Sequence, residues 1–246
     1  MSDETRRQSQ GRYELAVNLY RTENQPRSAL VELERAVRLD PNNGDAHLLI
    51  GQIYGGSGMF SEAEVSLRRA VEILRAEVEE DPSRRAPYGE ARNTLGAVLI
   101  NRGRAAEAVT VLTELTHDVY YPQPHLALSN LGLAYLTLGN YSEAVRVLER
   151  SVAQHADFCV GSYRLGEAYT RTGDDNRALA SLDRALGAPG SGCSNIQPAL
   201  RLRGEVNARL HHAEQAQADF TRCRELGADS QDGRACVTAL RSVEGP

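Results

Sequence analysis

The 246-residue chain contains no lysine and no tryptophan, and it has only three phenylalanines. All 28 of its basic residues are therefore arginines, and a core has to be built from leucine, alanine, valine and tyrosine. The longest apolar runs, such as residues 97–100, are too short to cross a bilayer, and the first residues do not form a secretory signal. The net charge of −5 argues against a nucleic-acid-binding surface.

Signatures of catalysis and of metal binding are also missing. The four cysteines form no Cys-x-x-Cys pair, and the six histidines form no His-Glu-x-x-His motif. The sequence contains no Gly-x-Ser-x-Gly segment and no glycine-rich phosphate loop. We therefore expect no enzyme, no catalytic residue, no cofactor and no metal site.

What the sequence does contain is a repeated pattern of small residues. A small residue, an alanine and a third small or apolar residue recur with spacings of 12 and 7, as in Gly51, Ala63 and Ala70. The six leading positions are Val17, Gly51, Gly96, Gly132, Gly166 and Gly204. Each middle alanine is followed four residues later by a large apolar residue, namely Leu33, Leu67, Leu112, Leu148, Leu182 or Phe220. Small residues let paired helices approach closely, so the pattern predicts six helix pairs.

A second pattern marks the turn inside each pair. Seven residues after each leading position stands a residue that tolerates a positive φ angle: Asn24, Gly58, Gly103, Gly139, Gly173 or His211. Glycine adopts this conformation without steric cost, and asparagine and histidine are the enriched exceptions. The pattern therefore predicts that the first helix of each pair ends next to these positions.

Together the two patterns resemble the tetratricopeptide repeat, a helix–turn–helix unit of about 34 residues. The resemblance implies an all-α, right-handed solenoid of six repeats over residues 10–228. An N-terminal tail, residues 1–9, would precede it, and a capping helix and tail, residues 229–246, would follow. We expect an extended second helix and a linker near residues 75–89 and a loop at residues 187–197. A polar terminal helix keeps a stacked repeat array soluble.

The first helices of such repeats line one face, which commonly holds an extended or helical peptide. Counting from the leading small residues assigns side chains to this face, and the apolar ones gather in the middle of the array. The predicted partner-binding groove comprises Leu48, Asn93, Ala97, Ile100, Leu126, Ser129, Leu133, Leu136 and Tyr163. A contiguous exposed apolar patch is typical of a partner site. The alternative is that the chain's own loop or termini cover these side chains.

A groove that grips a terminal carboxylate is a competing interpretation. Repeat-containing co-chaperones with such a carboxylate clamp carry lysine, asparagine and arginine at fixed groove positions. Asn130 and Arg164 fall at two clamp-like positions. The chain has no lysine, however, and other clamp positions carry Asn93, Ala97 and Val160. We therefore do not expect a carboxylate clamp.

The junction between the third and fourth copies, residues 117–132, has a more particular sequence. It resembles the PilF/PilW-type pilotins of type IV pilus biogenesis, and their relative Tgl, a lipoprotein of gliding motility. The residues that carry this junction motif are Tyr120, Tyr121, Pro122, Pro124 and Asn130. A simpler interpretation is a rigid connection, because prolines restrict φ and start the following helix.

The resemblance implies a protein-binding assembly factor on the periplasmic face of the outer membrane. Its partners would be secretin monomers of the pilus machine, whose multimerisation it would promote. Only a lipid anchor, absent from this chain, would attach it to the membrane. We expect a monomer that binds no nucleic acid. The alternatives are a cytoplasmic peptide-binding adaptor and a regulatory repeat domain of a larger protein.

The four cysteines all lie in the C-terminal half, between residues 159 and 236, and allow three complete pairings. Cys223 occupies a small packing position of the last copy and Cys236 lies early in the expected cap, so a bond between them would fasten the cap. Cys159 and Cys193 precede the first helices of adjacent copies and could also approach each other. Disulfides would indicate an oxidising compartment such as the periplasm, whereas free buried thiols would fit the cytoplasm.

Overall fold

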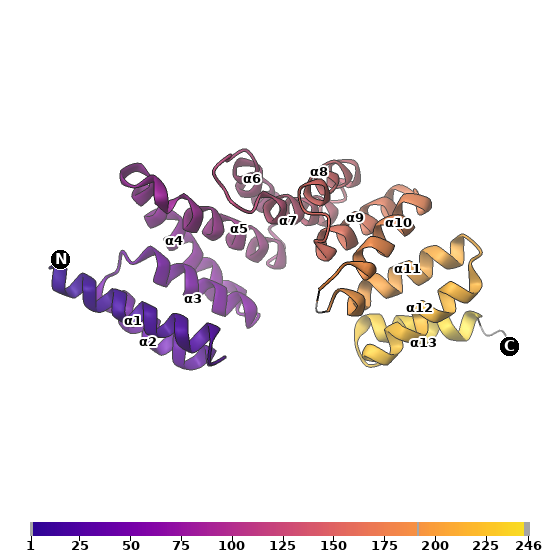
Figure 1. The fold of residues 1–246 in the computed structure, drawn as a ribbon, viewed down its shortest axis with the longest axis horizontal. Coiled ribbons are helices and arrows are strands. Elements are labelled where there is room, and N and C mark those ends of the chain that lie inside the picture. The colour runs from indigo at the N-terminus through magenta and orange to yellow at the C-terminus, as the bar shows by residue number, and fades with distance from the viewer. Residues whose placement is uncertain (1, 191, 244–246) are drawn as a thin grey trace. The chain divides into compact units, whose positions relative to one another are not determined.

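The computed structural model describes residues 2–190 and 192–243. Within these residues the chain forms thirteen α-helices and two short 3-10 helices, and it contains no strand (Figure 1). The chain divides into two compact units, residues 1–123 and residues 124–246. The boundary falls inside the range that the sequence analysis assigned to one continuous array.

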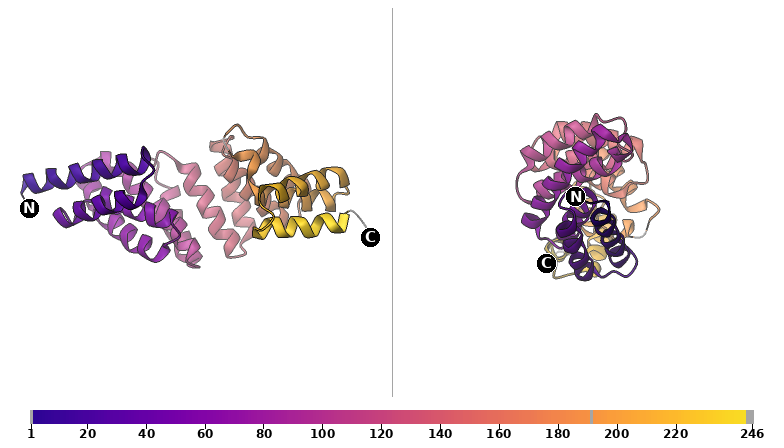
Figure 2. Two further views of the ribbon diagram at one scale, coloured as in Figure 1. Left: turned by 90° about the horizontal axis from the view of Figure 1, so that it is seen from below. Right: turned by 90° about the vertical axis from the view of Figure 1, so that its left-hand side faces the viewer.

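Both units consist of paired helices. Unit 1 contains α1 (Asp3–Arg21), α2 (Pro26–Leu39), α3 (Gly44–Gly56), α4 (Phe60–Glu80), η1 (Pro82–Arg84), α5 (Arg85–Asn101) and α6 (Ala105–Thr116). Unit 2 contains α7 (Pro124–Thr137), α8 (Tyr141–Gln154), α9 (Cys159–Thr172), α10 (Asp175–Gly187), η2 (Cys193–Asn195), α11 (Gln197–Arg209), α12 (Ala213–Leu226) and α13 (Gln231–Val243). Each odd-numbered helix from α1 to α11 packs against the helix that follows it, which confirms the six predicted pairs. The last helix, α13, drawn in yellow in Figure 2, packs against α12 and α11, as expected of a cap.

The leading glycines lie where the two helices of a pair touch. A Cβ atom added to Gly51, Gly96, Gly132 or Gly166 would lie 2.4–2.6 Å from the Cγ atom of a leucine on the second helix. These leucines, Leu67, Leu112, Leu148 and Leu182, are completely buried. Any side chain in place of the glycine would push the helices apart. The close packing that the repeat pattern predicted is therefore confirmed.

The turn inside each pair also follows the prediction. All six predicted turn residues have a positive φ, between 53° and 80°. Four of them are glycines, whereas Asn24 (φ 53°) and His211 (φ 61°) adopt this conformation with a side chain. Both are exposed, so the side chains meet no obstacle.

The N-terminal tail expected at residues 1–9 was a wrong prediction, because α1 begins at Asp3. The Ser2 side chain caps the first turn of this helix. Ser9 is completely buried, and its hydroxyl donates a hydrogen bond of 2.9 Å to the Ala36 carbonyl on α2. The polar sequence of this segment did not predict a helix, because no apolar stripe attaches it to the core. A serine hydroxyl holds it against α2 instead.

The extended second helix is α4, which has 21 residues where α2, α8 and α12 have 14. It ends at Glu80, and the Asp81 carboxylate then accepts a hydrogen bond of 2.9 Å from the Ser83 N–H in η1. Because α5 already begins at Arg85, the linker is shorter than residues 75–89 suggested. None of the helices in the described part of the chain has the length and hydropathy needed to span a membrane.

Candidate functional site

The first helices of neighbouring pairs lie side by side within each unit. In unit 2, α9 contacts both α7 and α11, and in unit 1, α3 contacts both α1 and α5. We call the surface formed by α7, α9 and α11 the first-helix face of unit 2. The predicted groove residues fall into two sets, because Leu48, Asn93, Ala97 and Ile100 belong to unit 1 and the others to unit 2.

Four predicted groove residues are not exposed, which corrects the sequence analysis. Only small fractions of Leu48 (6%), Ile100 (9%), Ser129 (1%) and Leu136 (8%) are accessible to solvent. Neighbouring first helices pack against each other within each unit, α3 against α5 and α7 against α9. They belong to the core and not to a solvent-facing patch.

The remaining apolar groove residues of unit 2 keep part of their surface open. Leu126 and Leu133 on α7 and Tyr163 on α9 are half-buried, and Val160, noted above at a clamp position and not among the predicted groove residues, is 37% exposed on α9. In unit 1, Asn93 and Ala97 on α5 are half-buried. The first-helix face of unit 2 therefore offers accessible apolar side chains from two adjacent helices.

Arg164 brings a positive charge to this face. Its Nη1 atom donates hydrogen bonds to Ser129 Oγ (2.8 Å) and Asn130 Oδ1 (3.0 Å), both on α7. Burial lowers the pKa of Arg164 to about 10, although Tyr163 and Glu167 oppose this shift. Burial likewise raises the pKa of the neighbouring Tyr163 to about 12. The two clamp-like positions noted in the sequence, Asn130 and Arg164, are thus in direct contact.

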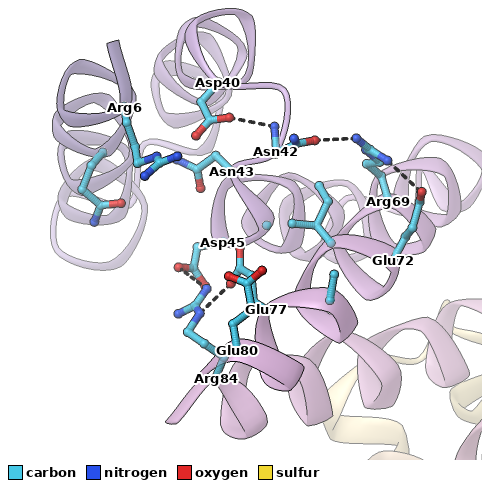
Figure 3. A pocket seen from close by; sticks show the side chains of 14 residues that line it. Arg6, Asp40, Asn42, Asn43, Asp45, Arg69, Glu72, Glu77, Glu80 and Arg84 are labelled. Atoms are coloured by element: carbon cyan, nitrogen blue, oxygen red, sulfur yellow. Dashed lines mark hydrogen bonds and ion pairs between the residues drawn. The ribbon is translucent and has the colours of Figure 1, made fainter. Parts of the chain in front are cut away.

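A polar cavity of about 860 Å³ lies in unit 1, between α1, α3 and the extended α4 (Figure 3). Arg84 projects between two carboxylates, at 2.8 Å from Asp45 and 2.6 Å from Glu77. Burial opposes its charge, but the bonds to Glu77 and Asp45 raise the pKa of Arg84 above its usual value. Arg69 similarly bonds Glu72 (2.8 Å). The repeat pattern did not predict this cavity, although the dense charges of residues 77–85 were a signal for it.

The junction motif has two different parts. Tyr121 is 4% exposed, and its ring fills the space beside Gly89 on α5, where an added Cβ atom would lie 2.3 Å from a ring carbon. Burial raises the pKa of Tyr121 to about 12. Pro124 is the first residue of α7. The second tyrosine of the motif thus belongs to the core of unit 1, and its second proline opens the first helix of unit 2.

The other part of the motif faces solvent. Tyr120 is 65% exposed, and the Arg85 guanidinium stacks 3.9 Å from the centre of its ring. Pro122 is exposed as well. These side chains line a shallow pocket in unit 1 together with Pro82 and Ala86. No sequence signal indicated the stacking of Arg85 on Tyr120.

The cysteines form two disulfides. Cys159, at the start of α9, is bonded to Cys193 in η2, with their Cα atoms 5.8 Å apart. Cys223 on α12 is bonded to Cys236 on α13, with a Cα separation of 6.2 Å. Both are pairings that the sequence analysis considered. Across residues 2–190 and 192–243, no group of three or more potential metal ligands comes together.

Comparison with known families agrees with the repeat pattern and the paired helices. One tetratricopeptide repeat model matches residues 20–79, and a second matches residues 93–157 and 129–192. Together these matches cover more than half of the chain. The chain belongs to the tetratricopeptide repeat family. The predicted fold class is therefore confirmed.

Two curated relatives are similar to parts of this repeat protein. Type IV pilus assembly protein PilF of Pseudomonas aeruginosa is 29% identical over 124 residues, which are 50% of this chain and 45% of PilF. Regulatory protein AfsR of Streptomyces griseus is 29% identical over 146 residues, which are 58% of this chain and 14% of AfsR. The sequence match thus spans less than half the length of each of these relatives.

Solved structures are similar over longer stretches of the repeat array. PilW, described as a widely conserved type IV pilus biogenesis factor, has a TM-score of 0.76 and 23% identity, with 95% of this chain and 98% of PilW covered. PilF of Pseudomonas aeruginosa has a TM-score of 0.73 and 19% identity, with coverage of 97% and 99%. YrrB, a repeat protein with an unusual peptide-binding site, has a TM-score of 0.55, 23% identity and coverage of 77% and 88%. The predicted resemblance to PilF and PilW is confirmed at the level of fold.

Proposed function

We propose that this repeat protein is a pilotin-like assembly factor of type IV pilus biogenesis, which binds secretin subunits and promotes their multimerisation. The likeness to PilW, over nearly the full length of both chains, carries the proposal. The sequence similarity to PilF supports it, because PilF is itself a type IV pilus assembly protein. The tetratricopeptide repeat is an interaction scaffold, which agrees with a role in binding and not in catalysis.

The binding surface in this proposal is the first-helix face of unit 2. Leu126, Leu133 and Tyr163 are half-buried there, and Val160 is exposed, so an apolar segment of a partner can bury them further. In this proposal the unassembled secretin subunit would expose apolar surface, which promotes aggregation until the subunits assemble. A repeat protein that covers such a segment keeps the subunit available for assembly.

The proposed location is the periplasmic face of the outer membrane, where a lipid anchor would hold the protein. The two disulfides support an oxidising compartment, since disulfides persist in the periplasm and are rare in the cytoplasm. The same observation argues against a cytoplasmic adaptor.

A second candidate function is that of a regulatory repeat domain in a larger protein. One observation favours it: the matched segment is more than half of this chain but only 14% of AfsR. The two candidates differ in their partners, because a regulatory domain would associate with a neighbouring domain of its own protein.

The deciding experiment measures secretin multimers in envelopes of cells with and without the protein. We expect that multimers disappear without it, that monomers accumulate, and that re-expression restores the multimers. The protein should also retain the secretin monomer in a pull-down from envelope extract. Unchanged multimers in the deletion strain would rule out the proposed function and favour the regulatory alternative.

A further inference from the structure

The half-buried arginines on α9 and α11 in unit 2 differ in their counter-charges. Arg201 bonds Asp232 at 2.6 Å and also pairs with Glu205. Arg203 bonds Asp219 at 2.6 Å and Asp183 at 2.8 Å. Arg164, in contrast, forms no ion pair with any carboxylate in the described part of the chain, and its hydrogen bonds go to neutral oxygens only.

The guanidinium of Arg164 also has N–H donors that form no hydrogen bond within the described residues. An arginine carries five N–H donors in a fixed planar fork, and Nη1 uses its two on Ser129 and Asn130. The Nε and Nη2 atoms have no hydrogen-bond acceptor among the described residues. In the described residues, the buried side-chain nitrogen and oxygen atoms without a hydrogen-bond partner are Thr113 Oγ1 and Ser162 Oγ. The Nε and Nη2 atoms of Arg164 are not among them, so these two atoms are not completely buried. Their N–H groups therefore reach solvent.

The surroundings of Arg164 make this arrangement costly without a ligand. Burial disfavours the charged form and lowers the pKa of Arg164, and two neutral oxygens compensate the charge less well than a carboxylate does. Glu167, one helical turn along α9, does not supply the counter-charge, because its carboxylate pairs with Arg171 at 3.5 Å. A half-buried cation held in place by two hydrogen bonds is thus ready to accept an anion.

We propose that Arg164 binds the carboxylate of an aspartate or glutamate side chain within an otherwise apolar partner segment on the first-helix face of unit 2. Ser129 and Asn130 are the positioning residues, because they hold Nη1 and leave Nε and Nη2 directed outward. Apolar contacts from Leu133 and Tyr163 would surround the ion pair. The inference rests on the proposed function only in that a protein segment occupies this face.

An internal acidic side chain suits the site better than a chain terminus does. Capture of a terminal main-chain carboxylate commonly uses several converging donors, as in backbone nests. Among the described arginines of α9 and α11, only Arg164 lacks a carboxylate partner, because Arg171, Arg201, Arg203 and Arg209 are all paired. One charge matches one side-chain carboxylate, and the apolar side chains of α7 and α9 leave room for the segment to continue.

The test uses nitrogen-detected NMR of the arginine Nε–H groups in the whole protein. The probes are the capped peptides Leu-Ala-Asp-Ala-Leu and Leu-Ala-Asn-Ala-Leu, and the peptide Leu-Ala-Leu-Ala-Leu with a free C-terminus. We expect a saturable shift of the Arg164 resonance with the Asp peptide and roughly tenfold weaker binding of the Asn peptide, a difference of about 1.4 kcal/mol. The Arg150 resonance, from an exposed arginine on α8, should not move.

Two variants complete the design. Arg164→Gln should lose the preference for the Asp peptide while its circular dichroism stays unchanged, and the matched control Arg150→Gln should keep it. Equal binding of the Asp and Asn peptides, tighter binding of the free C-terminus, or no saturable shift up to about 10 mM peptide would each overturn the proposal. Binding of secretin that is insensitive to Arg164→Gln would overturn it while leaving the proposed function intact. Arg164-dependent binding of the Asp peptide without any binding of secretin would support this inference and overturn the proposed function.

Discussion

A Cβ atom placed on Gly132 would lie 2.4 Å from the Cγ atom of Leu148, a separation that two carbon atoms do not tolerate. The two residues lie sixteen positions apart in the sequence and hold α7 directly against α8. The same relationship joins Gly51 to Leu67, so one contact, repeated along the chain, sets the spacing of the helix pairs.

Gly132→Ala should therefore destabilise the protein. The added methyl group forces Leu148 or the helix backbone to shift, and overpacking of this kind costs about 1–3 kcal/mol. Gly11→Ala is the matched control, because Gly11 lies in α1 and a methyl group added there meets no atom within 4 Å. That substitution should stabilise by roughly 0.5–1 kcal/mol, since alanine favours a helix more than glycine does. Denaturant unfolding checks both, and equal midpoints for the two variants would contradict the predicted contact.

Leu133→Arg should abolish partner binding while the protein stays helical. Leu133 is half-buried on the first-helix face of unit 2, so a charged side chain can reach solvent there but prevents burial of an apolar segment. Leu138→Arg is the matched control. Leu138 lies just beyond the end of α7 and is 43% exposed, so this variant should bind the partner normally. Circular dichroism and the envelope pull-down measure the two properties. An unfolded Leu133→Arg variant would show that this side chain belongs to the core.

Reduction of the Cys223–Cys236 disulfide should loosen α13. The bond closes a short loop, with a sequence separation of 13, and a cross-link of this kind contributes about 2–4 kcal/mol by restricting the unfolded chain. In a repeat array the effect should stay local. We expect faster amide hydrogen exchange in residues 220–243 after reduction and no change in unit 1. If both cysteines of protein purified from the envelope are alkylated without reductant, the bond does not form in the cell.

Stability should fall in acid through Glu64. Burial works against its charge, but hydrogen bonds from Arg68, Arg104 and Arg102 outweigh this and lower the pKa of Glu64 below the ordinary value of 4.5. A carboxylate whose pKa is lower in the folded state stabilises the fold fully above its unfolded pKa. That stabilisation disappears as the pH falls through the lowered folded pKa.

The matched measurement compares Glu64→Gln with the wild type between neutral and acidic pH. We expect the wild type to be the more stable protein at pH 7 and the difference in unfolding free energy to shrink below about pH 4.5. Glu143→Gln removes the partner of Arg146 in an exposed ion pair and should change little at any pH, because exposed pairs contribute little. A difference that is constant with pH would show that ionisation of Glu64 does not stabilise the fold.

Much of the fold could be predicted because the steric constraints that determine it act on single residues or between residues close together in the sequence. A positive φ at Gly173 and a close helix contact at Gly166 both depend on residues a few turns apart, which the repeat spacing reveals. The capping helix, α13, follows from the same reasoning, since a stacked array needs a polar end. The helical structure of residues 3–9 was not predicted, because a single buried hydroxyl, that of Ser9, attaches this segment to α2.

The candidate site was less predictable, because exposure depends on neighbours that lie far apart in the sequence. Helical periodicity assigned Leu133 and Leu136 to one side of α7. In the structure, however, Leu133 is half-buried, whereas only 8% of Leu136 is exposed to solvent. Adjacent tyrosines in the junction motif differ even more, since Tyr121 fills a space beside Gly89 and Tyr120 faces solvent.

The sequence by itself determined the number of helix pairs, the position of each turn and the small residues at which helices touch. These features follow from steric limits on single residues and from contacts within one repeat. Only the tertiary structure decided which groove residues stay accessible and which cysteines pair. Within the described residues it also left Arg164 without a carboxylate partner, whereas Arg201 has two. The reason is physical: burial and counter-charge are set by side chains on neighbouring helices, and no spacing within a single helix specifies them.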